Sequence, residues 1–292
     1  MSTARDRCRR KTAFVFAGGG SFGAVQAGML AALTARGIVP DMVVGSSVWA
    51  INAAFYSGNP TVSGVAELSR IWKSLRRSDV FPVTWRSLIG YALRRDGLWT
   101  QDGLRRLVRT HVPFTDLSDA RIPLHVVATD ILSGEEVVLS SGPAEDAIVA
   151  SAAIPAAFAP LEIGGRLLAD GAIASNTPVK AAVARGARRV FVLPTGLPSG
   201  LASRPRGAIA VALQALTLVL ARQMSAEIAS LESGIDCHIV PPPPRLAGSP
   251  CDFSRTAELI DRAAETAASW LDSREPRRIA PSPRPFAELA WA

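Results

Sequence analysis

The feature that most constrains this chain is an apolar run that ends in three glycines. Ala13 to Ala17 is typical of a short buried strand, and Gly18-Gly19-Gly20-Ser21-Phe22-Gly23 follows directly. The residues from Ser21 to Ala35 then have the spacing of a helix, which is expected to end near Gly37. A glycine turn between a strand and a helix brings backbone amides and a helix N-terminus close to a bound anion. The sequence therefore predicts an anion site here.

The same strand–helix pattern recurs along the chain. Asp41 to Val44 predicts a second buried strand, and an Ala-rich helix is expected from Ser47 onward. This alternation favours a parallel sheet with helices on its faces. The segment 61–112 is expected to be mostly helical. Later strands are expected at 124–129, 135–139, 189–193 and 235–240, and further helices at 144–153 and 255–271.

No repeat or shift in composition divides the chain. We expect a mobile arm over residues 1–11, one domain over 12–272, and a disordered tail rich in Pro and Arg over 273–292. Hydrophobic residues make up 48% of the 292 residues, which is enough for a sizeable core and excludes a fully disordered chain.

Charge and cysteine content bear on partners and compartment. The net charge is +7, but the arginines are scattered and form no basic arm, so no nucleic-acid partner is expected. A mild attraction to anionic membrane surfaces is consistent with this charge. Three widely spaced cysteines indicate a reducing compartment, and no apolar stretch reaches membrane-spanning length. We therefore expect a cytoplasmic protein, at most peripheral to the inner membrane face.

The glycine turn alone also matches a dinucleotide-binding fingerprint through Gly18, Gly20 and Gly23. Such a site needs an acidic residue at the end of the second strand. Here Asp41 begins that strand, and Gly45-Ser46-Ser47 follows its end. This placement argues against a dinucleotide.

The segment Val43-Val44-Gly45-Ser46-Ser47-Val48 has the arrangement of a nucleophile elbow, in which a strand, Gly-x-Ser and a helix follow one another. The glycine two positions earlier favours Ser47 over Ser46 as the nucleophile. A serine at this place also suits a helix N-cap, and the two roles are compatible.

A third motif, Leu168-Ala169-Asp170-Gly171-Ala172, lies more than a hundred residues downstream. Taken alone, Asp170 beside a glycine is more often an ordinary turn residue. Its significance comes from its combination with the glycine turn and the elbow.

In order and spacing, these three motifs resemble those of the patatin-like phospholipases. Ser151-Ala152-Ala153-Ile154-Pro155, Phe158, Pro160, Asn176 and Pro178 are also similar to that family, and the resemblance covers roughly residues 12 to 195. It implies a three-layer α/β/α fold with a central, mostly parallel sheet.

The resemblance also implies a catalytic Ser47–Asp170 dyad, in which Asp170-Gly171-Ala172 supplies the base. Its oxyanion hole would be formed by Gly18, Gly19, Gly20 and Ser21. The substrate would be a lipid or other acyl ester, with the head group and chain length left open. Consistent with a dyad, His111, His125 and His238 are the only histidines, and none lies in a triad motif. No metal or other cofactor is expected, because acidic residues and histidines do not cluster with ligand spacing.

One position departs from the family pattern. The pattern continues Gly-x-Ser-x-Gly, but the last place is Trp49, so either the helix shifts or the indole points into the pocket. Phe22 likewise stands where many relatives have a basic residue. Two interpretations stay open: a hydrolase with a reshaped or impaired site, and an inactive, membrane-associated lipid-binding protein.

Overall fold

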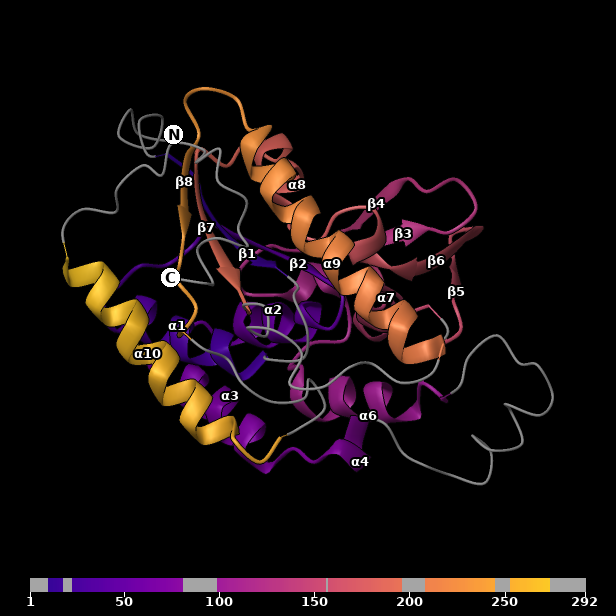
Figure 1. The fold of residues 1–292 in the computed structure, drawn as a ribbon, viewed down its shortest axis with the longest axis horizontal. Coiled ribbons are helices and arrows are strands. Elements are labelled where there is room, and N and C mark those ends of the chain that lie inside the picture. The colour runs from indigo at the N-terminus through magenta and orange to yellow at the C-terminus, as the bar shows by residue number, and fades with distance from the viewer. Residues whose placement is uncertain are drawn as a thin grey trace.

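A computed structural model of the chain describes residues 10–17, 23–80, 99–155, 157–195, 208–244 and 253–273. Within these residues one sheet has the strand order β5-β6-β3-β2-β1-β7-β8, and β4 pairs with β3 (Figure 1). The strands are β1 (Thr12–Ala17), β2 (Met42–Ser46), β3 (Leu124–Asp130), β4 (Glu136–Leu139), β5 (Leu161–Ile163), β6 (Arg166–Asp170), β7 (Arg189–Pro194) and β8 (Asp236–Ile239).

Helices cover both faces of this sheet (Figure 1). They are α1 (Gly23–Ala35), α2 (Trp49–Gly58), α3 (Val62–Ser74), α4 (Arg77–Val80), α6 (Asp102–His111), α7 (Ala144–Ser151), α8 (Val179–Ala184), α9 (Ala208–Ala229) and α10 (Thr256–Asp272). Where the chain is described, the expected elements are present within a few residues of their predicted bounds. Residues 21–22 of the first expected helix and 81–98 of the expected helical segment 61–112 lie outside the described residues. Most of the arm and most of the tail lie outside the described residues, so the domain boundaries stay predictions.

The layers follow from the alternation of side chains along the buried strands. In β1, Phe14 and Phe16 belong to one core cluster, together with residues of α1, α2, α3 and α10. Ala13 and Val15 belong to the opposite cluster, together with residues of α8 and Met224 of α9. The fold is thus three layers with the sheet in the middle, as predicted.

The sheet is mostly parallel. Strands β3, β2, β1, β7 and β8 pair in parallel, whereas β4 and β6 run antiparallel to β3. Strands β5 and β6 form a hairpin, in which Gly164 and Gly165 both have positive φ. Within the described ranges, no helix has both the length and the apolarity needed to cross a bilayer.

Candidate active site

Ser47 stands in a strained turn between β2 and α2. Its φ is 62°, and no other non-glycine residue in the described part of the chain has a positive φ. A β-carbon on Gly45 would lie 2.7 Å from Cβ of Ala53 and 2.8 Å from Cα of Ala50. Only a glycine at position 45 therefore lets α2 fold back this closely onto the strand it follows. The elbow predicted from the sequence is present, although regular helix begins at Trp49 rather than Ser47.

The register of the sheet explains why Asp170 meets Ser47. Ser46 pairs with Val127 of β3, and Asp170 pairs with Ala128, the next residue of that strand. The residue after Ser46 therefore comes level with Asp170 across β3. The Ser47 hydroxyl donates a hydrogen bond of 2.7 Å to Oδ2 of Asp170.

The two adjacent serines have different roles in the structure. The Ser46 hydroxyl donates to the Ser175 carbonyl at 2.9 Å and is fully buried. Only the Ser47 hydroxyl faces the carboxylate of Asp170. Of the two serines, Ser47 is thus the one that contacts Asp170, and its role as the nucleophile stays a prediction.

Asp170 is held from several directions. Its Oδ1 accepts a hydrogen bond of 2.9 Å from the Ala172 amide, and its own amide donates to the Ala153 carbonyl at 3.0 Å. Burial raises the pKa of this carboxyl to about 6, although the hydrogen bonds from Ser47 and Ala172 oppose the rise. A carboxylate with this pKa is mostly ionised at neutral pH and is a stronger base than an exposed aspartate.

Gly171 makes the approach of this segment possible. A β-carbon there would lie 2.1 Å from the Val127 carbonyl oxygen and 2.7 Å from the Ser46 hydroxyl. The glycine that follows Asp170 is thus required by the close contact of β6 with β2 and β3. Gly171 is therefore needed for close packing and not for a positive φ, which is the other common reason for a glycine in a turn.

Ser151, at the end of α7, is a site residue whose role the sequence did not reveal. Its hydroxyl accepts a hydrogen bond of 2.9 Å from the Ser47 amide and donates one to the Val127 carbonyl. This serine lies in the Ser151-Ala152-Ala153 motif, so the resemblance marked its position but not its contact. It satisfies the amide of the strained residue and links the elbow to β3.

The amide of Val48 follows that of Ser47 along the chain. Val48 precedes the first residue of α2, and its N–H has no hydrogen-bond partner within the described residues. The N–H after a nucleophile is the usual oxyanion donor at an elbow. The predicted oxyanion residues Gly18, Gly19, Gly20 and Ser21 lie outside the described residues, as does Phe22.

Trp49 is buried in the core, with only 2% of its surface exposed. A β-carbon on Gly23 would lie 2.6 Å from Cζ3 of Trp49 and 2.4 Å from Cζ2 of Trp72. Gly23, at the start of α1, therefore leaves room for the indoles of both Trp49 and Trp72. Neither of the two expected consequences is observed. Helix α2 keeps its close packing on β2, and the indole of Trp49 belongs to the core cluster.

The histidines take no part in this constellation. Burial lowers the pKa of His125 to about 4, and its Nδ1 lies 2.7 Å from the Ser140 hydroxyl. His238 lies on β8, at the opposite edge of the sheet from β5, and is buried beside Phe191. Burial lowers the pKa of His238 as well. Among the described residues, no three acidic, histidine or cysteine side chains are placed to hold a metal ion.

Helix α9 is fastened to the segment that follows Asp170. Gln223 donates to the Ala174 carbonyl at 2.8 Å, and the Thr177 amide donates to Oε2 of Glu227 at 2.7 Å. Burial raises the pKa of Glu227 to about 7. Polar contacts thus hold this part of α9 against the segment after Asp170, and Met224 is buried against the sheet.

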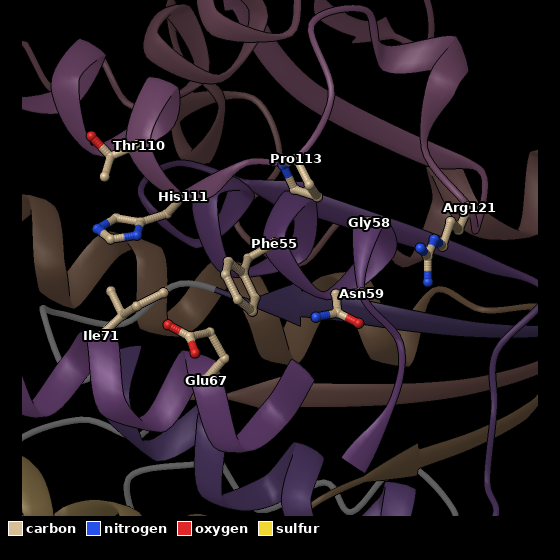
Figure 2. A pocket seen from close by; sticks show the side chains of 9 residues that line it. All are labelled: Phe55, Gly58, Asn59, Glu67, Ile71, Thr110, His111, Pro113 and Arg121. Atoms are coloured by element: carbon tan, nitrogen blue, oxygen red, sulfur yellow. The ribbon is translucent and has the colours of Figure 1, made fainter. Parts of the chain in front are cut away.

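A cavity of about 280 Å³ lies at the opposite end of α2 (Figure 2). Because α2 has ten residues, that end lies on the order of 15 Å from Ser47. The cavity is separate from the Ser47–Asp170 pair. It is lined by Phe55, Gly58, Asn59, Glu67, Ile71, Thr110, His111, Pro113 and Arg121.

The patatin-like phospholipase family profile matches residues 14–183, which is more than half of the chain. This chain belongs to the patatin-like phospholipase family. The match contains both the elbow and Asp170. The resemblance inferred from the motifs is thereby confirmed.

Two relatives of known sequence are similar to this chain over part of their own length. An uncharacterized NTE family protein of Mycobacterium tuberculosis (strain H37Rv) is 31% identical over 169 residues, which is 58% of this chain and 44% of that protein. The lysophospholipase NTE1 of Mycosarcoma maydis is 28% identical over 66% of this chain and 10% of its own length. The chain thus spans less than half the length of these patatin-like relatives.

Solved structures are similar at a lower level. VipD from Legionella pneumophila has a TM-score of 0.47 and 17% identity, with 90% of this chain and 67% of that chain covered. The type III effector ExoU has a TM-score of 0.41 and 16% identity, with 92% and 54% covered.

Proposed function

We propose that this chain is a lipid acyl hydrolase in which Ser47 is the nucleophile and Asp170 is the base. The observation that carries the proposal is the 2.7 Å hydrogen bond between a serine in a strained elbow and a buried carboxylate. Membership of the patatin-like phospholipase family and the lysophospholipase name of one relative support a lipid ester as the substrate class.

The first half of the reaction forms an acyl-enzyme. Asp170 takes the hydroxyl proton as Ser47 Oγ bonds to the carbonyl carbon of the ester. The negative charge that develops on the carbonyl oxygen is stabilised by the Val48 amide and by amides of Gly18 to Ser21. Such donors are typically worth about 3 kcal/mol each. Collapse of the intermediate breaks the ester C–O bond, and the leaving alcohol receives the proton from Asp170.

The second half regenerates the serine. Asp170 removes a proton from water, and the resulting oxygen attacks the acyl carbon. The Ser47–acyl bond breaks, and the proton returns to Ser47 as the fatty acid leaves. A single carboxylate thus serves both halves, which suits a pKa of about 6 at neutral pH.

The inactive lipid-binding alternative rested on Trp49. Two observations favour activity over it: the indole is buried in the core beside Gly23, and the Ser47–Asp170 contact is intact. The substitution therefore does not displace the two reacting groups from each other.

A direct assay compares five proteins on a short-chain nitrophenyl ester and on a lysophospholipid: the natural chain, Ser47→Ala, Asp170→Asn and two controls. The controls are Ser57→Ala, a buried serine near the other end of α2, and Asp130→Asn, an aspartate at the end of β3. We expect hydrolysis by the natural chain and both controls, and none above background in the dyad variants. A folded natural chain that hydrolyses neither substrate would overturn the proposal and favour lipid binding without turnover.

A further inference from the structure

Two buried carboxamides connect α1, α2 and the sheet. Gln26 of α1 and Asn52 of α2 are 0% and 1% exposed. Asn52 Nδ2 donates a hydrogen bond of 2.9 Å to Gln26 Oε1. Buried amides are costly unless they are paired, so their remaining contacts decide what this pair does.

Every polar atom of the pair has a partner. Gln26 Nε2 donates to the Leu193 carbonyl at 2.8 Å and to the Ala17 carbonyl at 3.3 Å. Asn52 Nδ2 also donates to the Gly23 carbonyl at 3.0 Å. Asn52 Oδ1 in turn accepts a hydrogen bond of 2.9 Å from Nε1 of Trp72. Such a fully satisfied network is rigid and tolerates little displacement of its members.

The backbone groups that the network holds are not arbitrary. Ala17 is the last residue of β1 and Gly23 is the first residue of α1, so these two carbonyls flank residues 18–22 on either side. Leu193 lies beside this end of β1, because Phe16 pairs with it in the sheet. The amides therefore fix both ends of the glycine-rich segment.

The network also includes the nucleophile helix. Asn52 lies on α2, which begins directly after the elbow of Ser47. Asn52 bonds directly to the Gly23 carbonyl, and its partner Gln26 bonds to the Ala17 carbonyl. These hydrogen bonds thus connect the helix that follows Ser47 to Ala17 and Gly23, the two residues that flank positions 18–22. A displacement of about 1 Å between reacting groups can cost on the order of a hundredfold in rate.

We propose that Gln26 and Asn52 are positioning residues for the oxyanion step, with Trp72 as the anchor of Asn52. They hold Ala17 and Gly23, the residues on either side of positions 18–22, at a fixed separation from the elbow of Ser47. The inference rests on the proposed hydrolase function. It assigns to this buried network a kinetic role beyond stabilising the fold.

The test uses substitutions that remove the hydrogen bonds with a side chain of similar length: Gln26→Met and Asn52→Leu. Trp72→Phe is a graded variant that loses one donor. The control is Leu33→Ala, a fully buried position further along α1 with no part in the network. Thermal unfolding is measured for each, and kcat and KM are determined on a nitrophenyl ester and on its thionoester analogue. Sulfur accepts amide hydrogen bonds poorly, so the oxygen-over-sulfur preference reports the oxyanion donors.

We expect Gln26→Met and Asn52→Leu to lower kcat about tenfold to a hundredfold with little change in KM, and to shrink the oxygen-over-sulfur preference. Trp72→Phe should lie between these variants and the natural chain. Leu33→Ala should lose Tm without losing that preference. If the network variants lose only Tm and keep both kcat and the preference, the inference is overturned while the hydrolase stands. An inactive, folded natural chain overturns both.

Discussion

The Ser47 hydroxyl and Oδ2 of Asp170 are 2.7 Å apart, although 123 positions separate the two residues in the sequence. Three strands bring them together: β2 ends at the elbow, β6 ends at the aspartate, and β3 lies between with adjacent residues paired to each. The contact between Ser47 and Asp170 is thus a consequence of sheet register. A slip of β6 by one residue would turn the carboxylate to the other face.

The raised pKa of Asp170 predicts the pH dependence of the reaction. The base must be ionised, so kcat/KM should rise with pH through a value near 6 and level off above it. Burial lowers the pKa values of all three histidines, that of His125 to about 4. We therefore expect no further rise in rate from a histidine that loses its proton above about pH 7. Rates over about pH 4.5 to 8 check this. A flat profile between about pH 5 and 7 contradicts it.

Asp170→Asn should stabilise the fold at neutral pH while abolishing activity. The folded-state pKa lies above the unfolded value of 3.8, so the natural chain loses stability as pH rises from about 4 through 6. The amide has no such charge to bury, and the gain is on the order of 3 kcal/mol above about pH 7. Urea unfolding at about pH 4 and pH 8 tests this, because the advantage should appear only at the higher pH. An equal effect at both would show that ionisation is not its cause.

Trp49→Gly should destabilise the protein even though it restores the family pattern. Its indole is buried beside Gly23 and Trp72, so a glycine at position 49 would leave a cavity in the core. Truncation of a buried tryptophan costs about 3 to 5 kcal/mol. Thermal or urea unfolding measures the loss, with Trp49→Phe as the milder comparison. A glycine variant as stable as the natural chain would mean that the ring contributes little to the core.

Ser151→Ala should impair the elbow without touching substrate. It leaves the buried Ser47 amide without its acceptor, which costs about 1 to 3 kcal/mol. Because that amide belongs to the residue with positive φ, we also expect kcat to fall. Ser151→Thr keeps the hydroxyl and should retain more activity than alanine if its methyl group is accommodated. Full kcat in a folded Ser151→Ala protein would contradict the positioning of Ser47 by this serine.

Local patterns were sufficient to predict most of the scaffold. Short apolar runs indicate the buried strands, and the position of Gly45 favours Ser47 over Ser46 as the nucleophile. In each case the signal lies within a few residues of the feature, where backbone sterics and side-chain periodicity act directly.

The features that were missed depend on contacts between distant segments. Nothing near Ser151 shows that its hydroxyl meets the Ser47 amide, and nothing near Trp49 shows that Gly23 makes room for its ring. The contacts of Gln26 and Asn52 likewise arise only when α1, α2 and β7 are assembled. A single sequence contains these residues but not the register that joins them.

The most direct test of the central claim is covalent trapping of the nucleophile. The natural chain is treated with an alkyl fluorophosphonate, and the modified residue is located by peptide mass spectrometry. The dyad predicts one adduct on Ser47, slow modification of Asp170→Asn, and no adduct at this site in Ser47→Ala. A folded chain that stays unmodified, or that is modified at another serine while Ser47 is untouched, would contradict the assignment of Ser47 as the nucleophile.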